Sequence, residues 1–376
     1  MEATQMMLNE NPGMSFNVYD WNGDGWVNQV LYVFAGYSGN NAKSFGYVWP
    51  NTSSFSTIQT PSGQRIYNYS VSAECWPIPD KESCGIGTIC HEFCHSLGLP
   101  DIYPTISSAG YSMVDEWDLM DGGNYTNYGW CPPNYSPMEK ILMKWLEPIE
   151  LTEATTITGM KCVADGGEIY KIRHTDDEYY LLENRQWTGW DAGVPGRGLV
   201  VYHVKYSYSR WSSNMVNSIA GSPFYSIVHA DGLDYDAWEA LVAARGYTSQ
   251  YQDSSRMKNY HLSTSPYPWS TDSTTIVNNE LSDTSSPASL MYETNAEGRT
   301  YLSKAIRNIS MTDDGLISFD FEGYIPNPVR TVTVREQPTR VYDLHGRYVG
   351  RRIESQRPGL YLVIQPDGTT KKVVKR

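Results

Sequence analysis

Basic residues are scarce in this sequence. The 376 residues include 29 lysines and arginines against 42 aspartates and glutamates, which gives a formal net charge of -13. Binding to nucleic acid requires clustered Lys and Arg that neutralise phosphates, and basic residues concentrate only at the C-terminus. We therefore expect no nucleic-acid partner.

Long apolar runs are also missing. No stretch reaches the roughly 18 apolar residues that a membrane-spanning helix needs, so we expect no transmembrane segment. The first residues, MEATQMMLNENPG, lack the basic and apolar parts of a secretory signal. The many tyrosines and tryptophans, with only modest charge, are nevertheless typical of a secreted or surface protein. We expect a secreted or cell-surface protein whose signal peptide is not in this chain.

Several catalytic motifs are absent. The sequence has no G-x-S-x-G and no Gly-rich phosphate loop after a strand, which argues against a serine hydrolase or a nucleotide-binding enzyme. Its six cysteines contain no CxxC pair, which argues against a cysteine-built zinc site. Cys75 and Cys84 flank a Pro-rich loop. They either form a disulfide or are present as two separate, buried thiols. Cys90 and Cys94 are expected to be small core-facing residues.

The length predicts two or three domains. Residues 1–150 contain sequence patterns of both helices and strands, so we expect an α+β catalytic domain there. The expected elements are a strand at 30–36 (VLYVFAG), loops rich in Ser, Thr, Asn and Pro at 49–83, a helix at 86–98, and a helix in SPMEKILMKWLEP that starts at Ser136-Pro137 and carries Ile141, Leu142 and Trp145 on one face.

Residues 151–325 are expected to form a β-rich, sandwich-like accessory domain. GEIYKIRH, EYYLLENRQW and GLVVYHVKYSYS are short strand patterns separated by turns, as in an antiparallel sheet. A long polar insertion at about 205–285 contains one helical pattern, at 235–246. After a linker at 324–330, residues 326–376 alternate strands and Gly turns, which predicts a small C-terminal β domain.

The stretch CHEFCHSLGLPDIY (90–103) carries the clearest chemistry. Residues four apart face the same way on a helix, so His91 and His95 can reach one metal ion. Glu92 can then take a proton from a metal-bound water, as in H-E-x-x-H metalloproteases. The alternative is a pair of structural histidines on an ordinary helix.

The residues that follow extend the motif. Gly98 permits the left-handed turn that ends a helix, and the chain then turns back through Pro100 to Asp101. The resulting HExxHxxGxxD pattern offers a third, oxygen ligand while leaving one position open for water. Two imidazoles and a carboxylate suit zinc, whereas calcium and magnesium prefer oxygen ligands throughout.

HEFCHSLGLPDIY, WDLMDGGNY (117–125) and SPMEKILMKWL together resemble the immune inhibitor A family of secreted bacterial zinc metallopeptidases. DWNGDGWVNQVLYVFAG (20–36), EYYLLENRQWTGWDAGVPGRGLVVYHV (178–204) and HADG (229–232) extend the resemblance. It implies a metzincin-like catalytic domain with a methionine turn, which maps onto Met120; a core methionine is the alternative.

This sequence departs from that family in two ways. The family has a propeptide and several strands before the Asp/Asn-Gly turn, whereas 19 residues precede Asp20 here. The resemblance therefore implies that N-terminal catalytic strands are missing. In relatives of this fold, the third ligand can also come from an acidic side chain further along, so Glu116 and Asp118 are alternatives to Asp101.

A second metal site is suggested near the N-terminus. The Asp/Asn side chains at positions 1, 3, 5 and 9 of a calcium-loop pattern are Asp20, Asn22, Asp24 and Asn28, with Gly25 at the sixth position. The twelfth position is Leu31 and not the usual bidentate Glu. The segment is either an open calcium loop that borrows a distant carboxylate or an Asx-turn hairpin without an ion.

We expect a secreted zinc endopeptidase that acts on protein or peptide substrates, with Glu92 as general base. Tyr125 and Tyr128 are candidates to stabilise the oxyanion. Two alternatives stay open: a catalytically impaired surface-binding or adhesive protein that retains the zinc site, and a zinc amidase acting on cell-wall material. Residues 326–376 resemble a type IX secretion sorting domain, which implies the secretion machinery as a partner.

Overall fold

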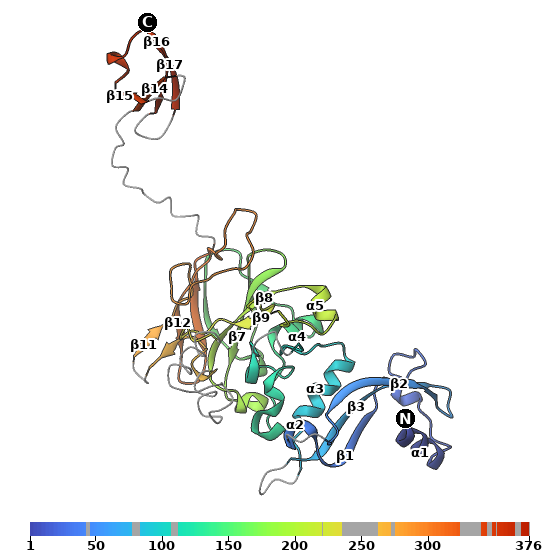
Figure 1. The fold of residues 1–376 in the computed structure, drawn as a ribbon. Coiled ribbons are helices and arrows are strands. Elements are labelled where there is room, and N and C mark those ends of the chain that lie inside the picture. Colours follow the sequence, from blue (N-terminus) through green and yellow to red (C-terminus); the bar gives the residue numbers. More distant parts are fainter. Residues whose placement is uncertain are drawn as a thin grey trace. The chain divides into compact units, whose positions relative to one another are not determined.

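A computed structural model gives the fold (Figure 1). It describes residues 1–42, 46–76, 83–106, 112–219, 221–234, 262–271, 275–323, 340–343, 348–350, 352–364 and 370–375. Two compact units, Met1–Tyr324 and Ile325–Arg376, are described one at a time. The described elements are mostly strands with a few short helices, which confirms a mixed α and β protein. The predicted helix at 235–246 and the linker at 324–330 lie outside the described residues.

The first unit begins with helix α1 (Glu2–Glu10) and a three-stranded sheet of β1 (Leu31–Tyr37), β2 (Asn51–Gln59) and β3 (Arg65–Cys75). The strand order is β1-β3-β2, with β1 parallel and β2 antiparallel to β3. The predicted strand at 30–36 is therefore confirmed. Its side chains alternate between exposed and half-buried, as on an edge strand.

The prediction of loops over 49–83 was wrong, because this region contains β2 and β3. Ser, Thr and Asn gave it the composition of a loop, but Thr and Tyr also favour strands. As an edge strand, β2 leaves most of its side chains half-buried or exposed, so it needs no apolar pattern. β3 buries Ile66, Ser70 and Ala73 and packs against helix α3 (Gly87–Ser96).

A five-stranded sheet follows, in the order β4-β6-β7-β8-β9. Its three longest strands confirm the predicted ones. The strands are β4 (Ile149–Glu150), β6 (Tyr170–Arg173), β7 (Glu178–Arg185), β8 (Gly198–Lys205) and β9 (Tyr225–Ile227). β4 is parallel to β6, and the other pairs are antiparallel. A second sheet joins β12 (Ile306–Met311), β13 (Ile317–Phe321) and β5 (Thr155–Met160).

Strand β7 is buried on both faces. Tyr179 and Leu181 belong to the core that also contains Cys94 and Met120. Tyr180 and Leu182 belong to the core shared with β12 and β13. Because successive side chains of a strand point to opposite faces, one strand contributes to two cores.

Helix α4 (Pro137–Leu142) starts as predicted, with Ser136 as its N-cap and a capping box to Glu139. The prediction that Trp145 continues this helix was wrong. Lys144 has φ 58°, and the Trp145 N–H donates to the Lys140 carbonyl, which closes the helix as a C-terminal turn. In the part of the chain that the structure describes, no helix is long and apolar enough to cross a membrane.

Short elements complete the first unit. The helical ones are η1 (Asn17–Tyr19), α2 (Gly39–Ala42), η2 (Asp115–Trp117), η3 (Gly122–Gly129), η4 (Val163–Asp165), η5 (Gly189–Gly193) and α5 (Tyr208–Ser212). β10 (Trp269–Ser270) and β11 (Ile276–Asn278) form a small hairpin.

The second unit is an antiparallel sheet in the order β15-β14-β16-β17. Its strands are β14 (Arg340–Asp343), β15 (Tyr348–Gly350), β16 (Gly359–Ile364) and β17 (Thr370–Lys375). A short helical turn, η6 (Ile353–Ser355), precedes β16. The predicted C-terminal strands are thus present.

Candidate metal centre

Helix α3 is held tightly at both ends. At its start, a Cβ on Gly87 would lie 2.0 Å from the Asn124 carbonyl oxygen of η3, so only glycine allows this approach. At its end, Gly98 has φ 96° and its N–H donates to the His95 carbonyl. The Leu99 N–H donates to the Cys94 carbonyl at 3.1 Å. The predicted helix and its glycine turn are both present.

This turn brings Asp101 back to the two histidines. Asp101 Oδ1 lies 3.1 Å from His91 Nε2 and 3.3 Å from His95 Nε2. Within the described ranges, these three residues are the one group of three metal-ligating side chains whose ligand atoms all fall within 4.8 Å of one another. Glu116 and Asp118 are not part of the group.

The ring orientations suit metal binding. His91 Nδ1 lies 3.0 Å from the Leu119 carbonyl oxygen, and His95 Nδ1 lies 2.8 Å from that of Leu99. A carbonyl can only accept, so each Nδ1 carries the proton and each Nε2 can present its lone pair to a cation. Asp101 Oδ1 is buried and no described donor reaches it in hydrogen-bonding geometry. Two nitrogens and one orphaned carboxylate oxygen fit a divalent cation such as zinc.

Charge and burial shift the acid–base properties of the site. Burial alone would raise the pKa of Asp101, but contact with His91 and His95 lowers it overall. Burial alone would lower the pKa of His95, but Asp101 raises it overall. Burial raises the pKa of Glu92, and the neighbouring histidines only partly offset this. The carboxylate of Asp101 therefore stays ionised while Glu92 becomes a stronger base.

Glu92 is also fixed by the adjoining sheet. Thr52 Oγ1, on β2, lies 2.5 Å from the Glu92 carbonyl oxygen and 3.2 Å from Glu92 Oε2. Ser70, on β3, donates to the same carbonyl at 3.1 Å. β2 therefore positions the candidate general base.

Two of the candidate ligands, His95 and Asp101, border a cleft of about 540 Å³ together with Glu92. Its other walls come from the start of β2, from Tyr103 and from the segment around α5, which contributes Trp211, Ser212 and Asn214. The Tyr103 ring is stacked on that of His91, with centroids 6.2 Å apart. Burial raises the pKa of Tyr103, and Asp101 raises it further, so the hydroxyl stays protonated at neutral pH.

Sequence reasoning missed Thr52, Tyr103 and Asn214. Tyr103 follows the motif directly, but no general pattern assigns a tyrosine there. Of the two tyrosines that were singled out, Tyr125 lies close enough to the site that Glu92 and Asp101 add to burial in raising the pKa of its hydroxyl. Tyr125 accepts a hydrogen bond from Asn40 at 3.0 Å, and its ring, like that of Tyr128, packs on Trp76.

Met120 is fully buried, and the backbone around it supports the candidate ligands. The neighbouring Leu119 carbonyl orients His91, and the Met120 carbonyl accepts from the Ile102 N–H, one residue after Asp101. Asp118 is buried beneath this turn, and its Oδ1 accepts from the Met120 N–H at 2.7 Å. Glu116 is half-buried.

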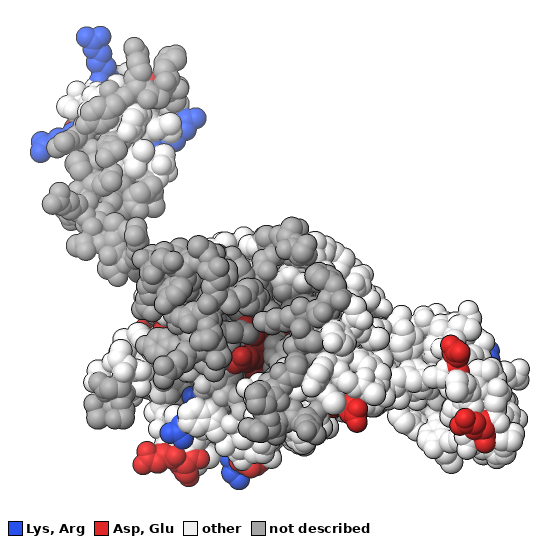
Figure 2. Space-filling view, turned by 60° about the horizontal axis from the view of Figure 1, so that its bottom comes forward, with Lys and Arg blue, Asp and Glu red and all other residues white. Residues whose placement is uncertain are grey.

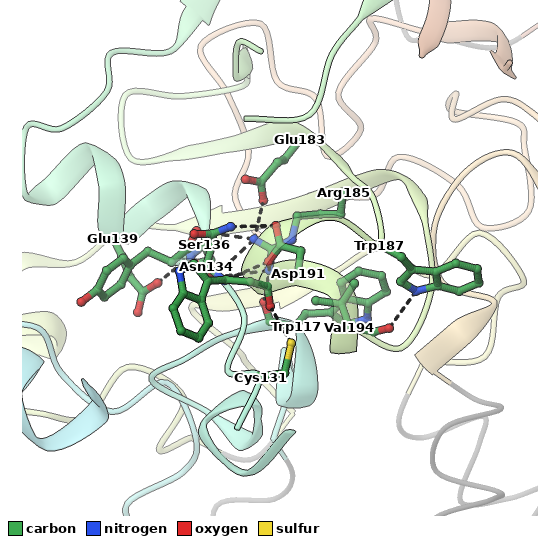
Figure 3. A network of polar contacts seen from close by, with 12 residues as sticks. Trp117, Cys131, Asn134, Ser136, Glu139, Glu183, Arg185, Trp187, Asp191 and Val194 are labelled. Atoms are coloured by element: carbon green, nitrogen blue, oxygen red, sulfur yellow. Dashed lines mark hydrogen bonds and ion pairs between the residues drawn. The ribbon is translucent and has the colours of Figure 1, made fainter. Parts of the chain in front are cut away.

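A buried ion-pair network anchors this segment to the five-stranded sheet (Figure 3). Arg185, on β7, donates to the Trp117 carbonyl at 3.1 Å and pairs with Asp191 at 3.1 Å and Glu183 at 3.3 Å. Glu183 also pairs with Lys140 of α4 at 2.7 Å. Breaking one partner of such a buried network leaves an uncompensated charge, so the network fixes the turn next to Met120.

The suggested calcium loop is an exposed turn. Both Asp20 carboxylate oxygens accept backbone N–H groups, from Asp24 at 3.0 Å and Gly25 at 2.9 Å. Other side-chain oxygens of the loop are also occupied within it. Asp24 Oδ1 accepts from the Trp26 N–H, and Asn28 Oδ1 accepts from the Trp21 N–H.

The side chains of the loop also contact one another, since Asn22 donates to Asp24 Oδ2 at 3.0 Å. These are the bonds of an Asx-turn loop, and calcium binding stays a prediction.

The cysteines near the site have definite positions. Cys94 is buried in the core, as predicted, and its thiol lies 2.7 Å from the Tyr135 hydroxyl. The Cys84 N–H donates to the Glu74 carbonyl, which places Cys84 beside the end of β3. Burial, and then the neighbouring Cys75, raise the pKa of the Cys84 thiol to about 11.

Figure 2 shows the charged side chains on one face of the molecule. That view has scattered acidic and basic side chains on the described surface and no continuous basic field. This agrees with the excess of acidic residues in the sequence.

Comparison with known proteins gives two matches. Residues 35–145 match the family model described as immune inhibitor A peptidase M6, catalytic domain. The chain is also 27% identical over 142 residues to immune inhibitor A from Bacillus thuringiensis subsp. alesti, a match that covers 33% of this chain and 20% of that protein. The matched region includes α3, Asp101 and Met120, so the candidate metal centre lies within a segment similar to a peptidase catalytic domain.

Proposed function

We propose that this protein is a zinc-dependent endopeptidase that acts on protein or peptide substrates. The convergence of His91 Nε2, His95 Nε2 and Asp101 Oδ1, next to a cleft that His95, Asp101 and Glu92 border, carries the proposal. The match of residues 35–145 to a peptidase catalytic domain supports it.

The proposed reaction uses four residues of this chain. His91, His95 and Asp101 would hold the ion, which when bound lowers the pKa of a water molecule and polarises the scissile carbonyl. Glu92 accepts the proton of the attacking water and later delivers it to the leaving amine. Its raised pKa suits both steps, because the same group must take and return a proton. Met120 would support the floor of the site without contacting substrate.

The test combines metal analysis with a protease assay. Purified protein is analysed for bound zinc, and casein cleavage is measured for the wild type, Glu92→Gln and a chelated sample. Glu153→Gln is a matched control, because Glu153 is an exposed glutamate between β4 and β5. We expect one zinc ion per chain and a loss of about 10²- to 10⁴-fold in kcat for Glu92→Gln, with Glu153→Gln unchanged.

Other outcomes would point to the alternatives. A wild type without zinc would contradict the metal site, and cleavage that survives in Glu92→Gln would contradict the mechanism. Zinc without cleavage of casein or gelatin, but with release of peptides from cell-wall material, would indicate the amidase. Zinc without either activity would indicate an impaired surface-binding protein.

We also propose that the protein is secreted or cell-surface, with residues 326–376 as a sorting domain for a type IX secretion machinery. The four antiparallel strands at the C-terminus and the resemblance of their sequence support this. Deleting residues 326–376 and comparing the protein in the medium with that in the cells would test it. Unchanged export after the deletion would contradict the sorting role.

A further inference from the structure

Asp101 is hydrogen-bonded to a residue that lies far away in the sequence. Asn214 Nδ2 donates to Asp101 Oδ2 at 2.7 Å, and Asn214 Oδ1 accepts from the Asp101 N–H at 2.5 Å. The two residues are 113 positions apart. One amide therefore makes a two-point contact with both the side chain and the backbone of the same aspartate.

We propose that Asn214 is a positioning residue that fixes Asp101 as the third metal ligand; the inference rests on the zinc site proposed above. The carboxylate of an aspartate can rotate about the Cβ–Cγ bond and present either oxygen, or both, to a metal ion. Because Asn214 occupies Oδ2, the other oxygen, Oδ1, faces His91 and His95. The amide is neutral, so it orients the carboxylate without cancelling the negative charge that attracts the cation.

The backbone around Asn214 is built for this contact. Asn214 has φ 56°, a left-handed conformation that asparagine tolerates better than most residues. Its carbonyl accepts from Thr105 Oγ1 at 2.8 Å, and the Met215 N–H donates to the Arg210 carbonyl, which closes the turn after α5. Hydrogen bonds to the backbone on both sides of the Asn214 side chain thus hold this residue in place.

The contact continues along the two segments. The Thr105 N–H donates to Ser218 Oγ at 3.2 Å, and Asn217 Nδ2 donates to the Ile102 carbonyl at 2.9 Å. Residues 214–218 therefore hold residues 101–105 at several points. The segment matched by the peptidase model ends at residue 145, so the ligand geometry depends on residues outside that segment.

The test uses the full chain and the variant Asn214→Gly. Glycine accepts a left-handed backbone without strain, so only the side-chain contacts are lost. Asn308→Gly is the matched control, because Asn308 has φ 53° and bonds an exposed carboxylate, Asp320 Oδ2, at 2.7 Å. Zinc affinity is measured by competition with a chromophoric chelator, and the visible absorption of the cobalt-substituted protein reports the ligand geometry.

For Asn214→Gly we expect a Kd for zinc that is about 10- to 100-fold higher and an altered cobalt spectrum. Asn308→Gly should leave both unchanged. If Asn214→Gly lowers the melting temperature of the metal-free protein but binds zinc within about twofold of wild type, with an unchanged cobalt spectrum, Asn214 only joins two segments and the proposal is overturned.

A second variant keeps the test decisive if Asn214→Gly does not fold. Asn214→Asp keeps the shape and the acceptor for the Asp101 N–H but replaces the donor to Asp101 Oδ2 with a repelling oxygen. We expect at least about a tenfold loss of zinc affinity, and affinity equal to or tighter than wild type would overturn the proposal. A wild type that binds no zinc would instead overturn the proposed function itself, before any variant is compared.

Discussion

Asp101, Glu116 and Asp118 are three acidic residues with different surroundings. Asp101 is 3.1 Å from His91 Nε2, whereas Asp118 bonds the backbone of Met120. Asp101→Asn should therefore raise the Kd for zinc by more than about 100-fold, because even the loss of an outer partner costs 10- to 100-fold. Glu116→Gln should leave the Kd unchanged. Chelator competition measures both, and a larger loss for Glu116→Gln than for Asp101→Asn would reverse the assignment.

We expect Thr52 to contribute to the proposed chemistry through Glu92. Its hydroxyl lies 3.2 Å from Glu92 Oε2, so Thr52→Val removes a group that orients the proposed general base. We expect kcat for peptide cleavage to fall by about tenfold, a fraction of what the base itself supplies, while zinc content stays the same. Thr57→Val, an exposed position on the same strand, is the control. Equal kcat values for the two variants would rule out this role.

The buried pair of Glu178 and His203 predicts acid lability. Their side chains are 2.7 Å apart, and Glu178 also accepts the N–H groups of Tyr292 and Glu293. Burial alone would raise the pKa of Glu178, but these bonds, with His203 first, lower it overall. A lowered folded-state pKa means that its stabilising contribution is present above the ordinary value of about 4.3 and is lost as pH falls through the folded value.

In Glu178→Gln, the free energy of unfolding should therefore decrease less steeply as the pH falls below about 4.3. Urea titrations of the metal-free protein at pH 6, 4 and 3 measure this, and working without metal removes the separate effect of zinc release in acid. Glu153→Gln should keep the wild-type slope. An unchanged slope in Glu178→Gln would mean that other carboxylates govern the acid response.

At the scale of elements, the contact between α3 and η3 sets the position of the proposed metal ligands. A methyl group at residue 87 would lie 2.0 Å from a backbone oxygen, which neither partner can avoid by a rotamer change. Gly87→Ala should destabilise the protein by about 1–3 kcal/mol, the usual cost of overpacking, and lower its zinc content. Gly13→Ala, where a methyl group meets nothing within 4 Å, is the control for thermal melting. Equal melting temperatures would contradict the tight contact.

Elements whose signals are local could be predicted from the sequence. His91 and His95 lie on one helix, and Gly98 lies in the turn that ends it. A few neighbouring residues were therefore enough to predict both α3 and the turn that brings the chain back to Asp101. β2 could not be predicted, because an edge strand with polar side chains has no apolar period. Asn214 could not be found either, since its partner is 113 residues away and no local pattern marks it. The early end of α4 depends on the left-handed Lys144, which sequence does not specify.

At the scale of the whole first unit, β7 joins the region of the proposed metal site to the second sheet. Leu181 lies in the core with Cys94 and Met120, and Leu182 lies in the core with Phe319 and Phe321. Both side chains are fully buried. A strand that packs on both faces cannot lose one core without disturbing the other, so we expect residues 1–324 to unfold as one cooperative unit and not in two steps divided near residue 150.

Leu181→Ala and Leu182→Ala test this cooperativity as a pair. Each should cost about 2–5 kcal/mol and lower the same calorimetric transition of the full chain, with zinc released in that transition. Val374→Ala is the control, because Val374 is 67% exposed and lies in the other compact unit. If Leu182→Ala shifted one transition while zinc release stayed at the wild-type temperature, the metal-bearing region would fold independently of the β12–β13 core. The strand would then link two separate domains instead of forming part of both.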